Sequence, residues 1–169
     1  MSIYTKGGDK GTTGTLAGDR VRKDSPVVQA NGAIDELNSA LGVVRAALAR
    51  SPHGAWAPLV GRVQRDLFSV GAFVSSGQMT YLDSVGTSAE EMERAIDDLF
   101  QGRVLDAFVI PGETLLDSWC HMARTACRRA ERSLVALDNQ DGVAQVLPWI
   151  NRLSDLLFAL AWFVADQGD

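Results

Sequence analysis

Three arginines recur about one helical turn apart in the second half of the chain, at Arg124, Arg128 and Arg132. Like charges at this spacing repel each other in a helix, and Glu131 offsets only part of that repulsion. Arginine forms bidentate hydrogen bonds with phosphate or carboxylate oxygens. The spacing therefore favours a helix face that binds a polyanion or a partner's carboxylate. A solvated charged face is the alternative.

A candidate partner carboxylate, Asp35, lies earlier in the chain, in a segment with helical apolar periodicity. It shares a narrow polar and small-residue side with Asn31, Asn38, Gly42 and Arg45. We expect Asp35 to pair with one of the three arginines, either in the same subunit or across an interface.

A similar polar line, formed by Asn151, Asp155 and Trp162, occurs near the C-terminal end of the sequence. An asparagine in such a line is either a hydrogen-bonded core amide or a ligand contact.

The first 23 residues are rich in glycine and threonine and contain all three lysines, Lys6, Lys10 and Lys23. Glycines let backbone N–H groups approach an anion closely, and hydroxyls add donors. The segment is not a Walker A loop or a dinucleotide-binding loop, because the required strand–helix context is missing. It suggests phosphate binding, with a flexible solvated arm as the alternative.

Apolar periodicity and breaker residues predict the elements that position these groups. Helices are expected at about residues 24–50, 55–76, 88–101 and 114–137, and a fifth begins between residues 143 and 148 and ends near 167. Ser88 and Glu91 form a capping-box pattern at the start of the third helix. Residues 102–113 are expected to be extended. Pro148 is expected either in the first turn of the fifth helix or at a kink in it. The sum is one all-α domain over residues 1–169: a five-helix bundle over residues 24–169, preceded by a loop or tail over residues 1–23.

Composition narrows the function classes. The chain has 169 residues, 46% hydrophobic and 22% charged, and a net charge of −5, which disfavours general nucleic-acid binding. No apolar run reaches membrane-spanning length and no signal peptide is expected. Cys120 and Cys127 lie about two helical turns apart, too far for a disulfide. These features predict a cytoplasmic protein.

Six blocks in order along the chain resemble the PduO-type cob(I)alamin adenosyltransferases. They are residues 4–11 (YTKGGDKG), 20–24 (RVRKD), 32–39 (GAIDELNS), 108–112 (FVIPG), 121–132 (HMARTACRRAER) and 151–155 (NRLSD). The resemblance implies transfer of the 5′-deoxyadenosyl group of ATP to the cobalt of cob(I)alamin or a related corrinoid. It also implies a homotrimer of five-helix subunits, with an active site at each subunit interface.

The resemblance further implies roles for individual residues. Asp35 would pair with Arg124 across the interface, Arg128 would stabilise the departing triphosphate, and Phe108 would lie against the lower face of the corrin. Without the resemblance, Phe108 would read as an ordinary core aromatic. Residues expected to contact ATP are Thr5, Lys6, Gly7, Gly8, Thr13, Gly14, Lys23, Arg128, Arg129, Glu131, Arg132 and Asn151. Mg²⁺ is expected to bind through the ATP phosphates rather than through protein side chains. A corrinoid reductase and an adenosylcobalamin-dependent enzyme are possible partners.

Four positions depart from the family pattern. Gly14 replaces a serine and Asn31 an aromatic residue, while Glu113 stands in place of a second glycine after Gly112 and Trp162 in place of an arginine. Two other functions therefore remain open. One is a non-catalytic carrier, chaperone or sensor that binds ATP or cobalamin; the other is a ferritin-like or structural bundle. The second is disfavoured because neither histidine follows a glutamate at the spacing a di-iron site needs.

Overall fold

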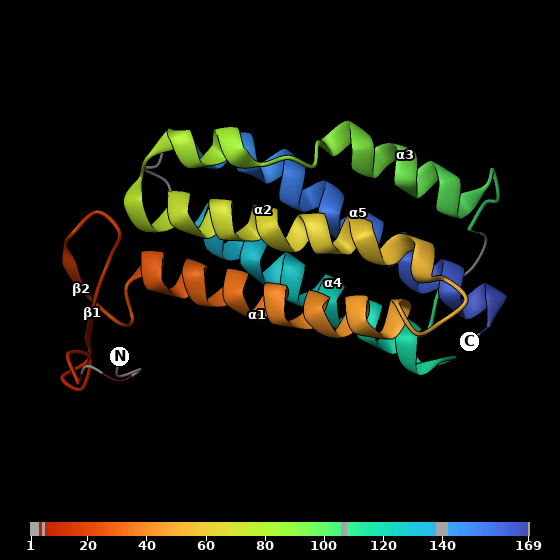
Figure 1. Cartoon of the computed structure of the whole chain (residues 1–169), viewed down its shortest axis with the longest axis horizontal. Coiled ribbons are helices and arrows are strands. Elements are labelled where there is room, and N and C mark those ends of the chain that lie inside the picture. Colours follow the sequence, from red (N-terminus) through yellow and green to blue (C-terminus); the bar gives the residue numbers. More distant parts are fainter. Residues whose placement is uncertain (1–3, 5, 106–107, 138–141, 169) are drawn as a thin grey trace.

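The computed structural model describes residues 4, 6–105, 108–137 and 142–168. Within these residues five α-helices run roughly along the long axis of the molecule, as Figure 1 shows. The helices are α1 (Pro26–Leu48), α2 (Ala57–Ser76), α3 (Ala89–Phe100), α4 (Leu115–Val135) and α5 (Val143–Gln167). This confirms the all-α five-helix bundle predicted from the sequence.

The core forms where the apolar stripes of these helices meet. On α1, Leu37, Leu41 and Leu48 are fully buried, as their helical spacing predicts. Helix α1 packs against α2 and α4, α4 also packs along α5, and α3 packs against α5. Helix α4 therefore lies between α1 and α5, so its remaining side chains are the ones that can face a ligand or a neighbouring subunit.

Helix starts follow the predicted signals with small differences. Ser88 accepts a hydrogen bond from the Glu91 backbone N–H at 3.1 Å, but the Glu91 side chain pairs with Arg62 on α2 instead of completing a capping box. Pro148 lies inside α5, in its second turn. Because proline has no N–H, it cannot form the helical hydrogen bond to the carbonyl four residues earlier.

The N-terminal arm, residues 6–25, contains a short hairpin that the sequence analysis did not predict. Strands β1 (Thr12–Gly14) and β2 (Arg20–Arg22) pair antiparallel, with Thr13 opposite Val21. Three-residue strands are too short to show a recognisable alternation of apolar and polar residues. Similarly, the linker after α2 contains a 3₁₀ helix, η2 (Met79–Ser84), where only a polar linker was expected.

Both cysteines are free, as their spacing predicted, and both are buried. None of the helices in the described ranges combines the length and the apolar character needed to cross a bilayer.

Candidate active site

The arm is held in a compact shape by one arginine that the sequence analysis gave no role. The Arg20 guanidinium donates to the Gly7 carbonyl at 2.6 Å and to the Thr12 hydroxyl at 2.8 Å. It therefore joins β2 to β1 and to the glycine-rich turn that precedes them. The sequence signal for this role would have been the position of Arg20 in a hairpin, but the sequence analysis did not recognise that hairpin.

This shape brings two of the predicted nucleotide-binding residues together. The Lys23 backbone N–H donates to the Gly11 carbonyl at 2.9 Å. A Cβ added at Gly8 would lie only 3.1 Å from Lys23 Nζ, so the ammonium group lies over the Gly8 backbone. The arm thus presents a cation beside a glycine turn, an arrangement suited to an anion. Thr13 and Gly14 lie on β1, whereas Thr5 is outside the described residues.

Ser75 on α2 docks the arm onto the bundle. Its hydroxyl accepts from the Leu16 N–H at 3.0 Å, and its carbonyl accepts from the Ala17 N–H at 3.3 Å. The hairpin loop therefore lies against the C-terminal end of α2.

The arginines of α4 are separated by their positions around the helix. Arg129 forms an ion pair with Glu36 on α1. Arg128 and Arg132 are exposed, and no ion pair or side-chain hydrogen bond joins either one to another described residue. Arg132 lines a groove of about 240 Å³ beside Pro26 at the start of α1. Of the three arginines on the predicted charged face, Arg128 and Arg132 are therefore exposed and available to an anion, whereas Arg124 is half-buried.

Acidic groups lie near Arg128 where α4 packs along α5. The buried thiol of Cys127 donates to the Ile150 carbonyl at 3.3 Å. Burial is the main cause that raises the pKa of Cys127 to about 12; Glu131 and Asp155 contribute to the rise, and Arg128 opposes it. These charges therefore lie around one point on the α4–α5 seam. At neutral pH the thiol is protonated and is not a nucleophile.

Asn151 is exposed on α5, one turn before Asp155, while Asp155 accepts from Arg152 at 2.5 Å. The structure thus brings Arg128, Glu131 and the Asn151 side of α5 to the same seam, and it directs Arg129 elsewhere.

Asp35 and Arg124 are not paired within the chain. The Asp35 carboxylate is exposed, and no described residue forms an ion pair with it. Arg124 is half-buried on the side of α4 that faces α5, with its guanidinium 5.8 Å from the Phe158 ring centre. The same-subunit pairing that the sequence left open is therefore absent from the described residues, and only the pairing across an interface remains.

One turn before Arg124, His121 is 5% exposed, and neither ring nitrogen has a hydrogen-bond partner among the described residues. Arg124 Nε is likewise buried without a partner in the described part of the chain. Burial lowers the pKa of His121, the charge of Arg124 lowers it further, and Asp117 opposes both. His121 is therefore neutral at physiological pH.

Phe108 lies in the extended segment before α4 and is fully exposed, so it is not the core aromatic that it would otherwise suggest. Ile110 in the same segment is 78% exposed. With Trp162 and Glu113 these side chains line a groove of about 450 Å³, called here the loop groove. Exposed apolar side chains gathered in a groove are typical of a ligand or partner site.

Asp117 anchors this segment to α4, a role the sequence analysis missed. Its buried carboxylate accepts from the Gly112 N–H at 3.1 Å and from the Thr114 N–H at 2.9 Å, and Thr114 caps Asp117 in return. Burial raises the pKa of Asp117, but the bonds from Gly112, Thr114 and Ser118 outweigh that effect, so the pKa lies below its usual value. The signal was a Thr-x-x-Asp capping pattern at residues 114–117.

Trp162 forms the far wall of the loop groove. Its ring stacks on Phe100 at 4.7 Å between centres, and Arg103 lies 4.4 Å from its centre. Arg103 in turn donates to Asp166 at 2.5 Å. The tryptophan that departs from the family pattern is therefore packed into an aromatic and ionic cluster.

The two groups of predicted site residues lie at opposite ends of the bundle (Figure 1). The arm and the C-terminal half of α4 are at one end, and the loop groove is at the other. Helix α4 has 21 residues and spans about 30 Å between them. Among the described residues, no cluster of three or more His, Cys, Asp or Glu side chains could hold a metal ion.

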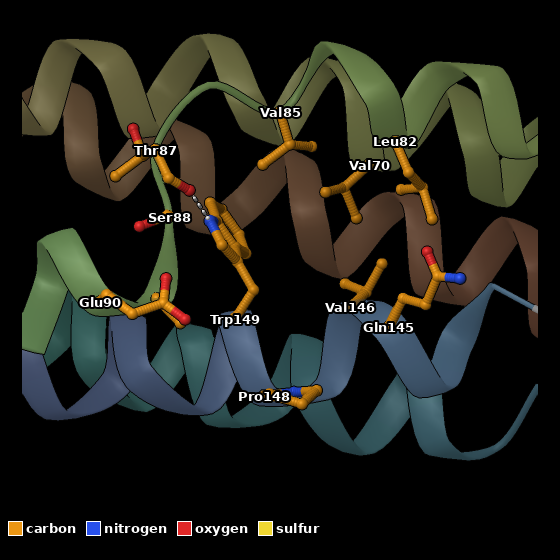
Figure 2. Close-up of a pocket in the computed structure, with 11 residues that line it drawn as sticks. Val70, Leu82, Val85, Thr87, Ser88, Glu90, Gln145, Val146, Pro148 and Trp149 are labelled. Atoms are coloured by element: carbon orange, nitrogen blue, oxygen red, sulfur yellow. Dashed lines mark hydrogen bonds between the residues drawn. The ribbon is translucent and has the colours of Figure 1, made fainter.

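Another cavity, of about 310 Å³, lies between η2 and α5 and contains none of the predicted site residues (Figure 2). Trp149 Nε1 donates to the Thr87 carbonyl at 2.8 Å across it. The Thr87 and Gly86 N–H groups donate to the buried Asp66 carboxylate. Both contacts fix the linker before α3, which indicates a structural role for these polar groups.

Known proteins share this sequence and this fold. The corrinoid adenosyltransferase PduO of Salmonella typhimurium is 42% identical over 95% of this chain, which spans 49% of that relative's length. The corrinoid adenosyltransferase of Bacillus subtilis is 40% identical over 95% of the chain and 85% of its own length. The chain therefore corresponds to about half of the Salmonella protein and to most of the Bacillus protein.

A solved structure has the same architecture. It is a variant PduO-type ATP:corrinoid adenosyltransferase from Lactobacillus reuteri, complexed with cobalamin and ATP. It superposes with a TM-score of 0.86 at 34% identity and covers 98% of this chain and 96% of its own. A sequence model described as cobalamin adenosyltransferase matches residues 3–164. The chain belongs to the cobalamin adenosyltransferase family.

Proposed function

We propose that the protein transfers the 5′-deoxyadenosyl group of ATP to the cobalt(I) of a corrinoid. The observation that carries the proposal is the unpaired charge at one end of the bundle. Arg128 and Arg132 are exposed on α4 without an ion-pair partner in the described chain, and the arm holds Lys23 over a glycine turn. A triphosphate matches this set of cations and donors. The similar structure from Lactobacillus reuteri contains ATP and cobalamin, which supports the same ligands here.

The reaction needs positioning more than chemical activation. The cobalt(I) electron pair attacks C5′ of ATP, a cobalt–carbon bond forms, and the bond from C5′ to the triphosphate oxygen breaks. The bonding pair leaves with the triphosphate, and cobalt changes formally from +1 to +3. Because cobalt(I) is itself the nucleophile, no activated side chain is needed, in keeping with the high pKa of Cys120 and Cys127. The protein must align C5′ with the metal and stabilise the leaving group.

The nucleotide roles follow from the exposed groups. The phosphates are enclosed by residues of the arm, namely Lys6, Gly7, Gly8, Thr13, Gly14 and Lys23. Thr5 is assigned to the same role from the sequence alone. Arg128 and Arg132 supply charge to the leaving triphosphate, while Glu131 and Asn151 line the seam beside them. Arg129 acts indirectly, because Glu36 already holds its guanidinium. Mg²⁺ would be held by the ATP phosphates rather than by protein side chains, and it would stabilise the negative charge of the leaving triphosphate.

The corrin binds in the loop groove, where Phe108 lies against its lower face. An apolar ring there excludes water and an axial ligand from cobalt, which favours the electron-rich metal. The exposure of Phe108 and Ile110 in one groove supports this role, because exposed apolar side chains that gather in a groove are typical of a ligand or partner site.

The active site forms between subunits of a homotrimer. Within one chain the arm and the loop groove lie at opposite ends of the bundle, too far apart for ATP and corrin to react. The exposed Asp35 and the half-buried Arg124 with its unpaired Nε suit a pairing across that interface. The cytoplasmic location, the reductase and the acceptor enzyme remain predictions from the sequence.

The test is turnover with a chemically reduced corrinoid. The protein is incubated with ATP, Mg²⁺ and cob(I)alamin, and the cobalt(I) absorbance is followed together with release of triphosphate. We expect the absorbance to fall as a light-sensitive cobalt–carbon product and one equivalent of triphosphate appear. Nucleotide binding without loss of cobalt(I) would instead favour a carrier, chaperone or sensor of the same fold.

A further inference from the structure

The loop groove carries an uneven distribution of charge. Glu113 and Asp166 are the two carboxylates among its described lining residues. Asp166 accepts from Arg103 at 2.5 Å and from Gln167 at 2.7 Å, so its charge is largely compensated. Glu113 is exposed, and no described residue forms an ion pair or a side-chain hydrogen bond with it. The groove therefore presents one uncompensated negative charge beside apolar side chains.

The backbone on both sides of Glu113 is fixed. The N–H groups of Gly112 and Thr114 both donate to the Asp117 carboxylate, at 3.1 and 2.9 Å. Asp117 is fully buried and sits in the first turn of α4. Gly112 has a φ of 119°, a conformation that glycine adopts without strain. The backbone that carries Glu113 is therefore anchored beside the groove, within reach of a ligand there.

A carboxylate on an anchored backbone can distinguish the chemical groups at the edge of a corrin ring. A carboxamide there is neutral and has two N–H donors, which a carboxylate accepts. A carboxylate at the same position has no proton to donate and repels Glu113. Resting on the proposed function, we propose that Glu113 is a specificity-determining residue: it favours corrinoids whose ring-edge groups are carboxamides over corrinoids in which these groups are carboxylates.

The discrimination is expected to be moderate and sensitive to salt. Glu113 is exposed, so water and counter-ions screen its interaction with a second charge. One contact between partly solvated charges corresponds to a change of about tenfold in relative efficiency.

The experiment compares cobyrinic acid with its heptaamide, which have the same ring and differ only in carrying carboxylates or carboxamides at its edge. Both are reduced chemically to cobalt(I), and kcat/KM is measured for each with saturating Mg-ATP. The wild type should prefer the heptaamide, and Glu113→Gln should reduce this preference about tenfold, mainly by lowering KM for cobyrinic acid. The KM for ATP should not change. Added salt should reduce the preference of the wild type more than that of the variant.

Glu90→Gln is the matched control, since it is the same substitution at another exposed glutamate that lines the separate cavity of Figure 2. It should leave the preference unchanged. An unchanged preference in Glu113→Gln, or an equal change in Glu90→Gln, would overturn the inference while leaving the proposed function intact. If the wild type turned over neither of these corrinoids nor cob(I)alamin, the proposed function would fail. Equilibrium binding of the two corrinoids to wild type and variant would then decide the inference, and equal affinity ratios would refute it.

Discussion

At the arm end of the bundle, functional groups are carried by regular elements, whereas at the loop-groove end they are carried by an extended segment. Arg128 and Arg132 take their direction from the period of α4, and the arm is a hairpin closed by Arg20. Phe108 and Glu113 belong to the extended segment, which the buried carboxylate of Asp117 ties to α4 at Gly112. A charged site can thus be built from helix geometry alone. An apolar surface in an extended segment needs a buried polar anchor, because the segment lacks the regular backbone hydrogen bonds of a helix or sheet.

The comparison also separates the two chemical tasks. The arm end offers positive charge to a leaving group, and the loop-groove end offers an apolar surface to a ring. Substitutions at the two ends should therefore fail in different ways.

The largest effect is expected at the arm end. Arg128→Ala should lower kcat by roughly 100- to 1,000-fold, since a positioned donor to developing charge contributes that much in other enzymes. The KM for the corrinoid should change little, because the charge acts on the triphosphate. The measurement is the initial rate with cob(I)alamin and saturating Mg-ATP.

Arg94→Ala on α3 is a suitable control, because it removes an exposed arginine that belongs to neither end's proposed site. Turnover within a factor of two of the wild type in Arg128→Ala would show that the exposed α4 cation is only a solvated surface charge.

A smaller and more selective effect is expected at the loop-groove end. Phe108→Ala should reduce adenosylation of cobalt(II) corrinoid, supplied with a reductant, at least about tenfold more than adenosylation of cobalt(I) prepared beforehand, a difference of about 1.4 kcal/mol in barrier. The reason is that the ring acts on the reducibility of cobalt rather than on the transfer itself.

Phe68→Ala on α2 removes another exposed phenylalanine and should affect both substrates equally, if at all. Equal losses on the two substrates in Phe108→Ala would mean that the ring serves packing alone. The contrast between the ends would then disappear.

The sequence predicted the helices and the charged end far better than the loop-groove end. The five helices and the exposed arginines follow from a period of 3.6 residues, which a linear sequence displays directly. The exposure of Phe108 could not be derived from a periodic pattern of apolar residues, and its role was predicted from the family resemblance alone. Arg20, Ser75 and Asp117 were missed because each acts through backbone groups distant or irregular in conformation, which side-chain patterns do not reveal.

The sequence analysis did not predict the ion pair between Arg129 and Glu36, the residue next to Asp35. A shift of one residue turns a side chain by about 100° around a helix, so it changes the partner completely. Asp35 and Arg124 remain candidates for contact with another subunit, which no single-chain argument could have distinguished beforehand.

The smallest effect is expected at His121, which lies on α4 between the anchor Asp117 and Arg124. Its folded pKa is lowered by burial first and by Arg124 second, so protonation opposes folding. The stabilising neutral form is fully present above the unfolded pKa of about 6.5, and stability is lost as pH falls from there toward the folded pKa.

His121→Leu and His121→Gln should both reduce the loss of unfolding free energy that occurs as pH falls below about 6.5. The change should remain below about 1.4 kcal/mol per pH unit, the value for one fully linked proton. Urea unfolding between pH 7.5 and pH 5 measures it. If the two variants show the same dependence of unfolding free energy on pH despite different absolute stabilities, the effect comes from titration and not from packing. If both variants depend on pH as steeply as the wild type, His121 is excluded as the titrating group.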